Sequence, residues 1–266
     1  MPVICRLPQK SSGSVVLTGT AIESDVASGK TFYNTDSNTK LTGTASGGGM
    51  VLPIGADCRP TGAVTIPSGV TSIAQYAFYQ NTAVTSVVMP NTITTMADSV
   101  FTGCTNLANV TLSNNLSNVS DHAFAGCSNL TDISFPSSIT QLSGGAFNGC
   151  TKLNNINIPT NITTILMQSF CACSGLTTIT INAIVININN YTFQGCINLE
   201  FVTLASGFNC TLNLSYSTKY SRDTIMAMIN AYVNASGKTL TMGATNLAKL
   251  STEDKAVASN KGLTLA

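Results

Sequence analysis

Six phenylalanines recur in this chain at intervals of 23 residues, with no insertion or deletion between them. A fixed period of about 20 to 50 residues is typical of proteins in which one supersecondary unit is repeated and stacked. The spacing therefore predicts coils of equal length, whose equivalent side chains form columns along the stack. The first such column consists of Phe78, Phe101, Phe124, Phe147, Phe170 and Phe193.

Other positions of the repeat are equally regular. Three residues after the phenylalanine, the first copy carries Asn81 and the other five carry a cysteine. Apolar residues then alternate with polar ones, as at Ile156 and Ile158, which predicts a short half-buried strand. A second apolar stretch, which opens at Ile93 in the first copy, returns the chain to the next phenylalanine. The cysteines of the repeat are Cys104, Cys127, Cys150, Cys173 and Cys196.

These columns predict a repeat solenoid over residues 50–214, with a parallel β-sheet on its concave side. We expect nine strands, the first at Val64 and Ile66 and the last at Leu263 and Leu265. At roughly 4.8 Å per strand the sheet would be about 40 Å long. Because a single coil cannot bury its apolar face alone, both ends of the stack need caps.

The two flanks lack the repeat. Residues 215–266 are expected to form a C-terminal capping region, because apolar spacing predicts a helix over 223–233 and Ser251 opens a second helix. Residues 1–49 are expected to form a small attachment module, with a short helix over 24–28 and an apolar anchor at Phe32 and Tyr33. The run Gly47-Gly48-Gly49 predicts a flexible joint between this module and the solenoid.

Charge is scarce throughout the chain. Charged residues make up 9% of it, against roughly 25% in soluble domains. Between residues 64 and 208 one lysine stands against four acidic residues, a net charge of −3. We expect no nucleic-acid partner, because phosphate binding needs clustered Lys and Arg. We also expect no membrane insertion, since no apolar run is long enough, and no secretory signal is visible at the start.

The repeated cysteines occupy one position per coil, where a small buried side chain is needed. We therefore expect buried free thiols, with disulfides or metal binding as the alternative. Cys171 and Cys173 form the one close pair, but zinc requires four ligands and neither a second pair nor a partner histidine accompanies them. We expect no metal site and interpret Cys171 as incidental.

No arrangement of residues predicts catalysis. His122 stands in a column whose other members are Tyr, Ser, Gly and Gln, which indicates an exposed turn. Asp121 beside it does not form a dyad, because no nucleophile is placed by a motif. Gly29-Lys30-Thr31 and Gly237-Lys238-Thr239 lack the upstream glycine of a phosphate-binding loop. We expect neither an enzyme nor a cofactor.

The remaining candidate site is the exposed side of the concave strands, where alternation places amides and hydroxyls in two rows. Such a neutral, hydrogen-bonding surface suits a glycan or a protein surface. Ser, Thr and Asn also occur there simply because they solvate a strand, and this alternative stays open. The candidate ligand-binding residues are Ser86, Asn109, Asp132, Asn155, Thr178 and Phe201 in one row and Val88, Thr111, Ser134, Asn157, Thr180 and Thr203 in the other.

The repeat from Ala123 to Leu142, AFAGCSNLTDISFPSSITQL, closely resembles the BspA-like leucine-rich repeat family. The likeness covers residues 64 to about 208. It implies a leucine-rich-repeat solenoid of a kind common on bacterial surfaces, which adheres to host proteins, glycans or other cells. It implies no catalytic residue.

Two flanking stretches are similar to segments of tail-associated proteins from phages and prophages of gut bacteria. One comprises residues 28–34 and 41–44, and the other comprises residues 240–250 and 260–266, where Leu263 replaces an expected tryptophan. We therefore expect a phage-tail or prophage-encoded adhesin, in the virion or on a cell surface, whose N-terminal module contacts tail partners and whose concave face recognises a bacterial surface. The alternative is a BspA-type bacterial cell-surface adhesin that binds a host protein or glycan.

Overall fold

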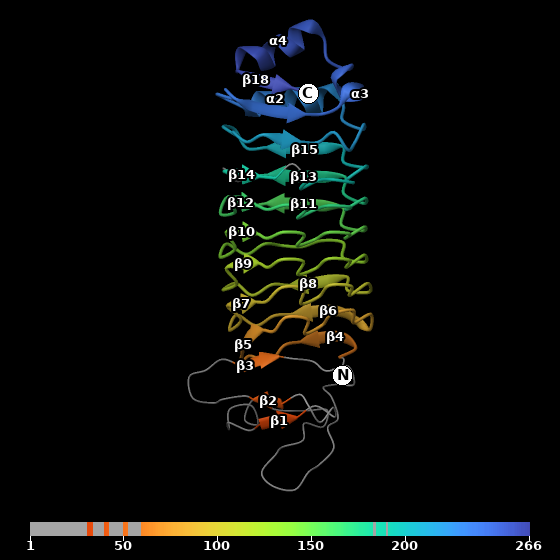
Figure 1. Ribbon diagram of the computed structural model, residues 1–266, viewed down its shortest axis with the longest axis vertical. Helices are drawn as coiled ribbons and strands as arrows, with labels where there is room; N and C mark the ends of the chain where they lie inside the picture. Colours follow the sequence, from red (N-terminus) through yellow and green to blue (C-terminus); the bar gives the residue numbers. More distant parts are fainter. Residues whose placement is uncertain (1–30, 34–39, 43–49, 53–59, 183–184, 190) are drawn as a thin grey trace.

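The computed structural model describes residues 31–33, 40–42, 50–52, 60–182, 185–189 and 191–266. Their coils are stacked in a column, with successive strands one above the other and helices at the C-terminal end (Figure 1). The predicted repeat solenoid is confirmed. In the expected attachment module, β1 (Thr31–Tyr33) pairs antiparallel with β2 (Lys40–Thr42). The helix expected over 24–28 and the glycine joint lie outside the described residues.

The half-buried strands of the repeat form the first of two ladders that run along the column. Equivalent residues pair in parallel at a separation of 23 residues, as Asn155 does with Thr178 and Thr178 with Phe201. The expected single sheet of nine strands is wrong, because this ladder consists of two three-stranded sheets. Its strands are β4 (Gly62–Thr65), β6 (Val84–Val88), β8 (Asn109–Thr111), β11 (Asn155–Ile158), β13 (Thr178–Ile181) and β15 (Phe201–Leu204).

The first ladder is interrupted in the coil between β8 and β11, where residues 131–136 form no strand. This coil carries Phe135 in a column that otherwise holds Met, Leu or Ile. The Phe135 ring is partly buried and packs edge-on against Phe147, with ring centroids 5.8 Å apart. We attribute the interruption to this larger ring, because a core built for smaller side chains accommodates extra volume by shifting the backbone.

The second ladder lies where the chain returns toward the next phenylalanine. The sequence predicts only an apolar stretch there, without strand pairing. Most of these strands have two residues, and their second residue, such as Leu142 or Ile165, is buried. The strands form two parallel sheets, made of β3 (Met50–Leu52), β5 (Val70–Ile73) and β7 (Thr95–Met96), and of β9 (Asn118–Val119), β10 (Gln141–Leu142), β12 (Thr164–Ile165) and β14 (Asn187–Ile188).

The six repeated phenylalanines form one interior column, as their spacing predicts. All six are buried. Centroids of successive rings lie between 4.8 Å, for Phe78 and Phe101, and 5.9 Å, for Phe170 and Phe193. Stacked aromatic pairs at such distances are stabilised beyond the gain from area burial. The column therefore joins each coil to the next through the centre of the protein.

The cysteine column runs beside the phenylalanines, and each repeated thiol donates a hydrogen bond to the carbonyl oxygen of the phenylalanine one coil earlier. The Sγ–O distances range from 2.9 Å at Cys104 to 3.2 Å at Cys150. In the first copy, Asn81 Nδ2 donates to the Pro60 carbonyl at 3.0 Å instead. All five thiols are buried, as the sequence predicts. Burial raises the pKa of Cys196 to about 12.

Left-handed backbone turns the chain on both sides of the phenylalanine. Two residues before it, φ is positive at five successive copies, from Tyr76 to Gln168. Two residues after it, most copies carry glycine, which adopts this conformation without steric cost. Gly126 has a φ of 72°, whereas Ala172 occupies the equivalent position with a φ of 56°.

The strands of the C-terminal region form a three-stranded parallel sheet of their own. Here β16 (Leu212–Asn213), β17 (Lys238–Thr241) and β18 (Leu263–Leu265) pair in parallel. The predicted helices are confirmed as α2 (Arg222–Ala231) and α4 (Thr252–Asn260), and the short α3 (Ala244–Leu247) was not anticipated. We expected the last two strands to resume the first sheet. That expectation is wrong, because α2 packs against β15 and takes the place of the next strand.

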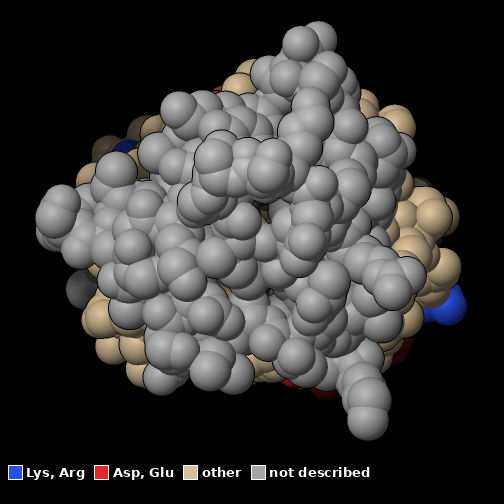
Figure 2. Space-filling model, turned by 90° about the horizontal axis from the view of Figure 1, so that it is seen from below, with Lys and Arg blue, Asp and Glu red and all other residues tan. Residues whose placement is uncertain are grey.

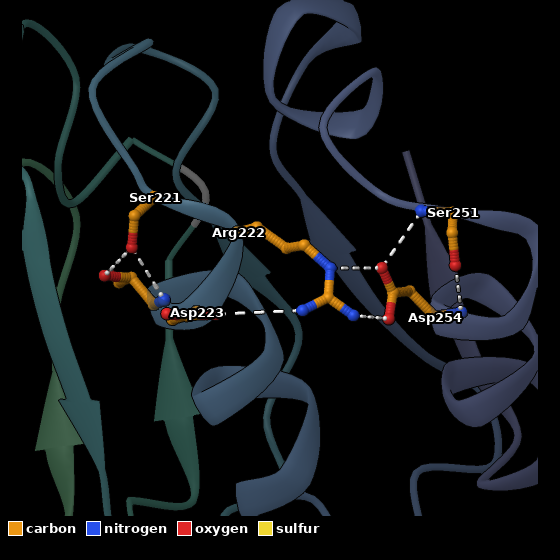
Figure 3. A network of polar contacts seen from close by, with 6 residues as sticks. Ser221, Arg222, Asp223, Ser251 and Asp254 are labelled. Atoms are coloured by element: carbon orange, nitrogen blue, oxygen red, sulfur yellow. Dashed lines mark hydrogen bonds and ion pairs between the residues drawn. The ribbon is translucent and has the colours of Figure 1, made fainter.

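A polar network joins the two helices (Figure 3). Arg222 Nε and Nη2 donate to the two carboxylate oxygens of Asp254, at 2.8 and 2.5 Å. Asp254 also accepts a hydrogen bond from the Ser251 backbone, while the Asp254 amide donates to Ser251 Oγ, which completes a capping box at the start of α4. The network therefore couples the start of α2 to the start of α4, with the Asp254 carboxylate largely buried.

Candidate binding face

The twelve candidate residues all lie on the outer side of the first ladder, and together we call them the strand face. Each is exposed or partly exposed, whereas the residues between them in the strands, such as Val87 and Ile156, are mostly buried. The strand face comprises Ser86, Val88, Asn109, Thr111, Asp132, Ser134, Asn155, Asn157, Thr178, Thr180, Phe201 and Thr203.

Strand pairing brings ten of these residues into register. Ser86 pairs with Asn109, and Val88 pairs with Thr111. The other half of the face consists of two columns of three residues, namely Asn155, Thr178 and Phe201 beside Asn157, Thr180 and Thr203. Asp132 and Ser134 are exposed on the segment that forms no strand. Strand pairing therefore does not hold these two residues in register with the other ten.

The strand face is rich in hydrogen-bonding groups and poor in charge. Asp132 is its one charged residue. Sequence reasoning missed Asn182, which follows β13 and donates through Nδ2 to Asn157 Oδ1 at 2.8 Å. The alternation of Thr178 and Thr180, extended by one more step, would have found it. The missed residue adds an exposed amide to the face.

Two side chains of the strand face are apolar and exposed. Val88 is 42% exposed in β6, and Phe201 is 52% exposed in β15. Phe201 belongs to the last strand of the first ladder, against which α2 packs. Figure 2 shows the column from below, and the described residues visible around its rim are mostly uncharged.

The other candidate chemistries find no geometric support. His122 is exposed at a turn with a φ of 53°, as predicted, and its ring lies against Gly145. Asp121 accepts a hydrogen bond from the Gly144 amide at 2.6 Å, and so caps the neighbouring coil. Cys171 is partly buried, which raises the pKa of its thiol. Across the part of the chain that the structure describes, His, Cys, Asp and Glu form no group of three that could hold a metal ion.

Equal coils, two parallel ladders, a stacked phenylalanine column and an outward face of amides and hydroxyls define a leucine-rich-repeat solenoid. The BspA type leucine-rich repeat region, in six copies, matches residues 56–174 and 118–228. The chain belongs to this family, whose members are typically cell-surface proteins that bind and do not catalyse.

Solved structures share the fold. A leucine-rich repeat protein of T. pallidum (TpLRR) is 22% identical, with 77% of this chain and 85% of that chain covered and a TM-score of 0.55. A leucine-rich repeat protein from Bacteroides ovatus is 19% identical, with 70% and 61% covered and a TM-score of 0.50. No curated protein matches the chain significantly. None of the helices in the described ranges is long and apolar enough to cross a membrane.

Proposed function

We propose that this protein is an adhesin that binds its ligand through the strand face. The observation that carries the proposal is the register of outward amides and hydroxyls in β6, β8, β11, β13 and β15. Each coil adds polar side chains at a fixed spacing of about 4.8 Å, so the face presents an extended set of donors and acceptors. The repeat family to which the chain belongs supports a binding or adhesion role.

The particle that carries the adhesin is the second part of the proposal. The similarity of residues 28–34 and 240–250 to tail-associated proteins favours a phage tail or a prophage-encoded particle. In a tail adhesin of this kind, the N-terminal module attaches to tail partners and the strand face recognises a bacterial surface. The chain then divides into an attachment region that ends at residue 49, a binding region that ends at residue 214, and a capping region. The repeat itself favours the alternative, a bacterial cell-surface adhesin for a host protein or glycan.

Adhesion of the purified full chain to whole cells tests the first part. Fluorescently labelled protein is incubated with gut bacterial and epithelial cells, and the test variant carries Asn109→Ala, Asn155→Ala and Asn157→Ala together. The matched control carries Asn118→Ala and Asn187→Ala, which change amides of the second ladder. We expect the strand-face variant alone to lose adhesion. Equal adhesion of the two variants would contradict the proposal.

Immunogold electron microscopy separates the two carriers. With an antibody against the solenoid, we expect label at the tails of particles released by induction of the source culture. Label on the envelope of uninduced cells, with unlabelled particles, would instead establish the bacterial surface adhesin.

A further inference from the structure

Phe201 differs from every other member of its column on the strand face. The equivalent positions hold Ser, Asn, Asp, Asn and Thr, and Phe201 alone presents a ring, which is 52% exposed. An aromatic side chain in this position gains little from burial in the free protein. Thr178 pairs with it on β13, and Thr203 points outward two residues further along β15. The ring is therefore an apolar platform with hydroxyls on its border.

Amides lie two strands away from this ring. Asn155 and Asn157 are both exposed in β11. The hydrogen bond from Asn182 to Asn157, at 2.8 Å, fixes which way the Asn157 amide oxygen points. Each amide can donate and accept, as can the hydroxyls of Thr178 and Thr180. This combination matches sugar hydroxyls, which also donate and accept.

The distribution of these groups decides between classes of ligand. A polyanion needs clustered cations, and the strand face has none. Protein interfaces concentrate binding energy in central Trp, Tyr and Arg residues that become fully desolvated. Here the centre of the face holds amides and hydroxyls, and the single ring lies at one end in β15. A neutral carbohydrate fits this arrangement better than either alternative.

We propose that the strand face from β11 to β15 binds a neutral oligosaccharide, with one sugar ring stacked on Phe201 and hydroxyls of neighbouring sugars bound to Asn155, Asn157, Thr178 and Thr180. The inference rests on the proposed function and adds the chemistry of its ligand. With about 4.8 Å between adjacent strands, Phe201 and Asn155 lie roughly 10 Å apart, a distance that one sugar ring does not span. The ligand is therefore an oligosaccharide.

A printed array tests this chemistry on the full chain. The probes are neutral hexose and N-acetylhexosamine oligosaccharides, with sialylated and sulfated counterparts of the same backbones. We expect the parent protein to bind neutral members and Phe201→Ala to weaken that binding about tenfold, the loss of one stacking contact. Phe201→Tyr, which keeps the ring, should retain binding. Ile186→Ala, which removes an exposed apolar side chain beside β14, is the matched control.

Two patterns of array binding would overturn the oligosaccharide proposal, and so would an array without binding. One is binding restricted to the sialylated or sulfated probes, and the other is neutral binding that Phe201→Ala leaves unchanged. If the array shows no binding while the three-asparagine variant still abolishes adhesion to cells, the ligand is a protein and the proposed function stands. If that variant also adheres normally, the proposed function itself fails.

Discussion

The thiol of Cys127 donates a hydrogen bond to the carbonyl oxygen of Phe101, with Sγ and O 3.1 Å apart, and so links two successive coils inside the core. The same link recurs from Cys104 to Cys196. It explains why the column holds cysteine and not alanine, because a side chain of this size must fill the space and also offer a donor.

Removing this thiol should therefore destabilise the solenoid. We expect Cys127→Ala to lower the free energy of unfolding by about 1 to 2 kcal/mol, from the cavity and the lost hydrogen bond together. Urea denaturation monitored by circular dichroism measures the change. Thr131→Ala, at an exposed position four residues away, should change it by less than about 0.5 kcal/mol. A Cys127→Ala variant as stable as the parent would show that the column is incidental.

The left-handed turns give a pair of opposite predictions. Ala172→Gly should raise the free energy of unfolding by about 0.5 to 1 kcal/mol, because it removes the steric cost of an alanine at a φ of 56°. Gly126→Ala should lower it by about 1 to 2 kcal/mol, although a Cβ there would meet no atom closer than 3.6 Å. Thermal melts of both variants test the pair. Changes of the same sign would refute the explanation.

The interruption at Phe135 predicts a local weakness in the first ladder. Backbone amides at residues 132–135 should exchange with deuterium faster than those of β8 and β11, because they lack the hydrogen bonds of a strand ladder, which protect amides from exchange. Phe135→Leu, which restores the side-chain size of neighbouring coils, should slow exchange in this segment. Hydrogen–deuterium exchange with mass spectrometry measures both. Unchanged exchange in the variant would show that the ring does not cause the interruption.

The Arg222–Asp254 pair predicts an acid-sensitive C-terminal cap. Hydrogen bonds from Arg222 lower the pKa of Asp254 below its usual value. The stabilisation is therefore fully present above the unfolded-state pKa, about 3.9, and is lost as the pH falls through the lower folded-state value. Melting temperatures at a series of pH values should show Asp254→Asn below the parent at pH 7, with the difference shrinking below about pH 4. A constant difference would contradict this account.

The columns of the fold were predictable from the sequence because each follows from an unbroken spacing of 23 residues. This period and the alternation of strand residues were enough to predict the phenylalanine column and the outward position of Asn155 and Thr178. The second ladder was not predictable, since two-residue strands such as β10 carry no alternation. The pairing of β17 with β16 was also hidden, because only the structure shows that α2 takes the next place beside β15.

Most of the candidate site was also predictable from the sequence. Alternation placed all twelve residues of the strand face outward, and missed Asn182 only because the expected strand ended one step too early. The interruption of the ladder at residues 131–136 had no sequence signal, because Phe135 is an apolar residue in an apolar column and leaves the pattern unchanged. The proposed ligand chemistry rests on the position of Phe201 at the end of the strand face, and only the strand order shows that position.

The central claim is that ligands bind to the first ladder and not to the second. Thr180 in β13 and Thr164 in β12 are partly exposed threonines on the two ladders, so arginine at either position adds the same bulk and charge. We predict that Thr180→Arg abolishes adhesion to cells while Thr164→Arg adheres like the parent, with similar melting temperatures for both. Loss of adhesion in Thr164→Arg alone, or in neither variant, would contradict the account.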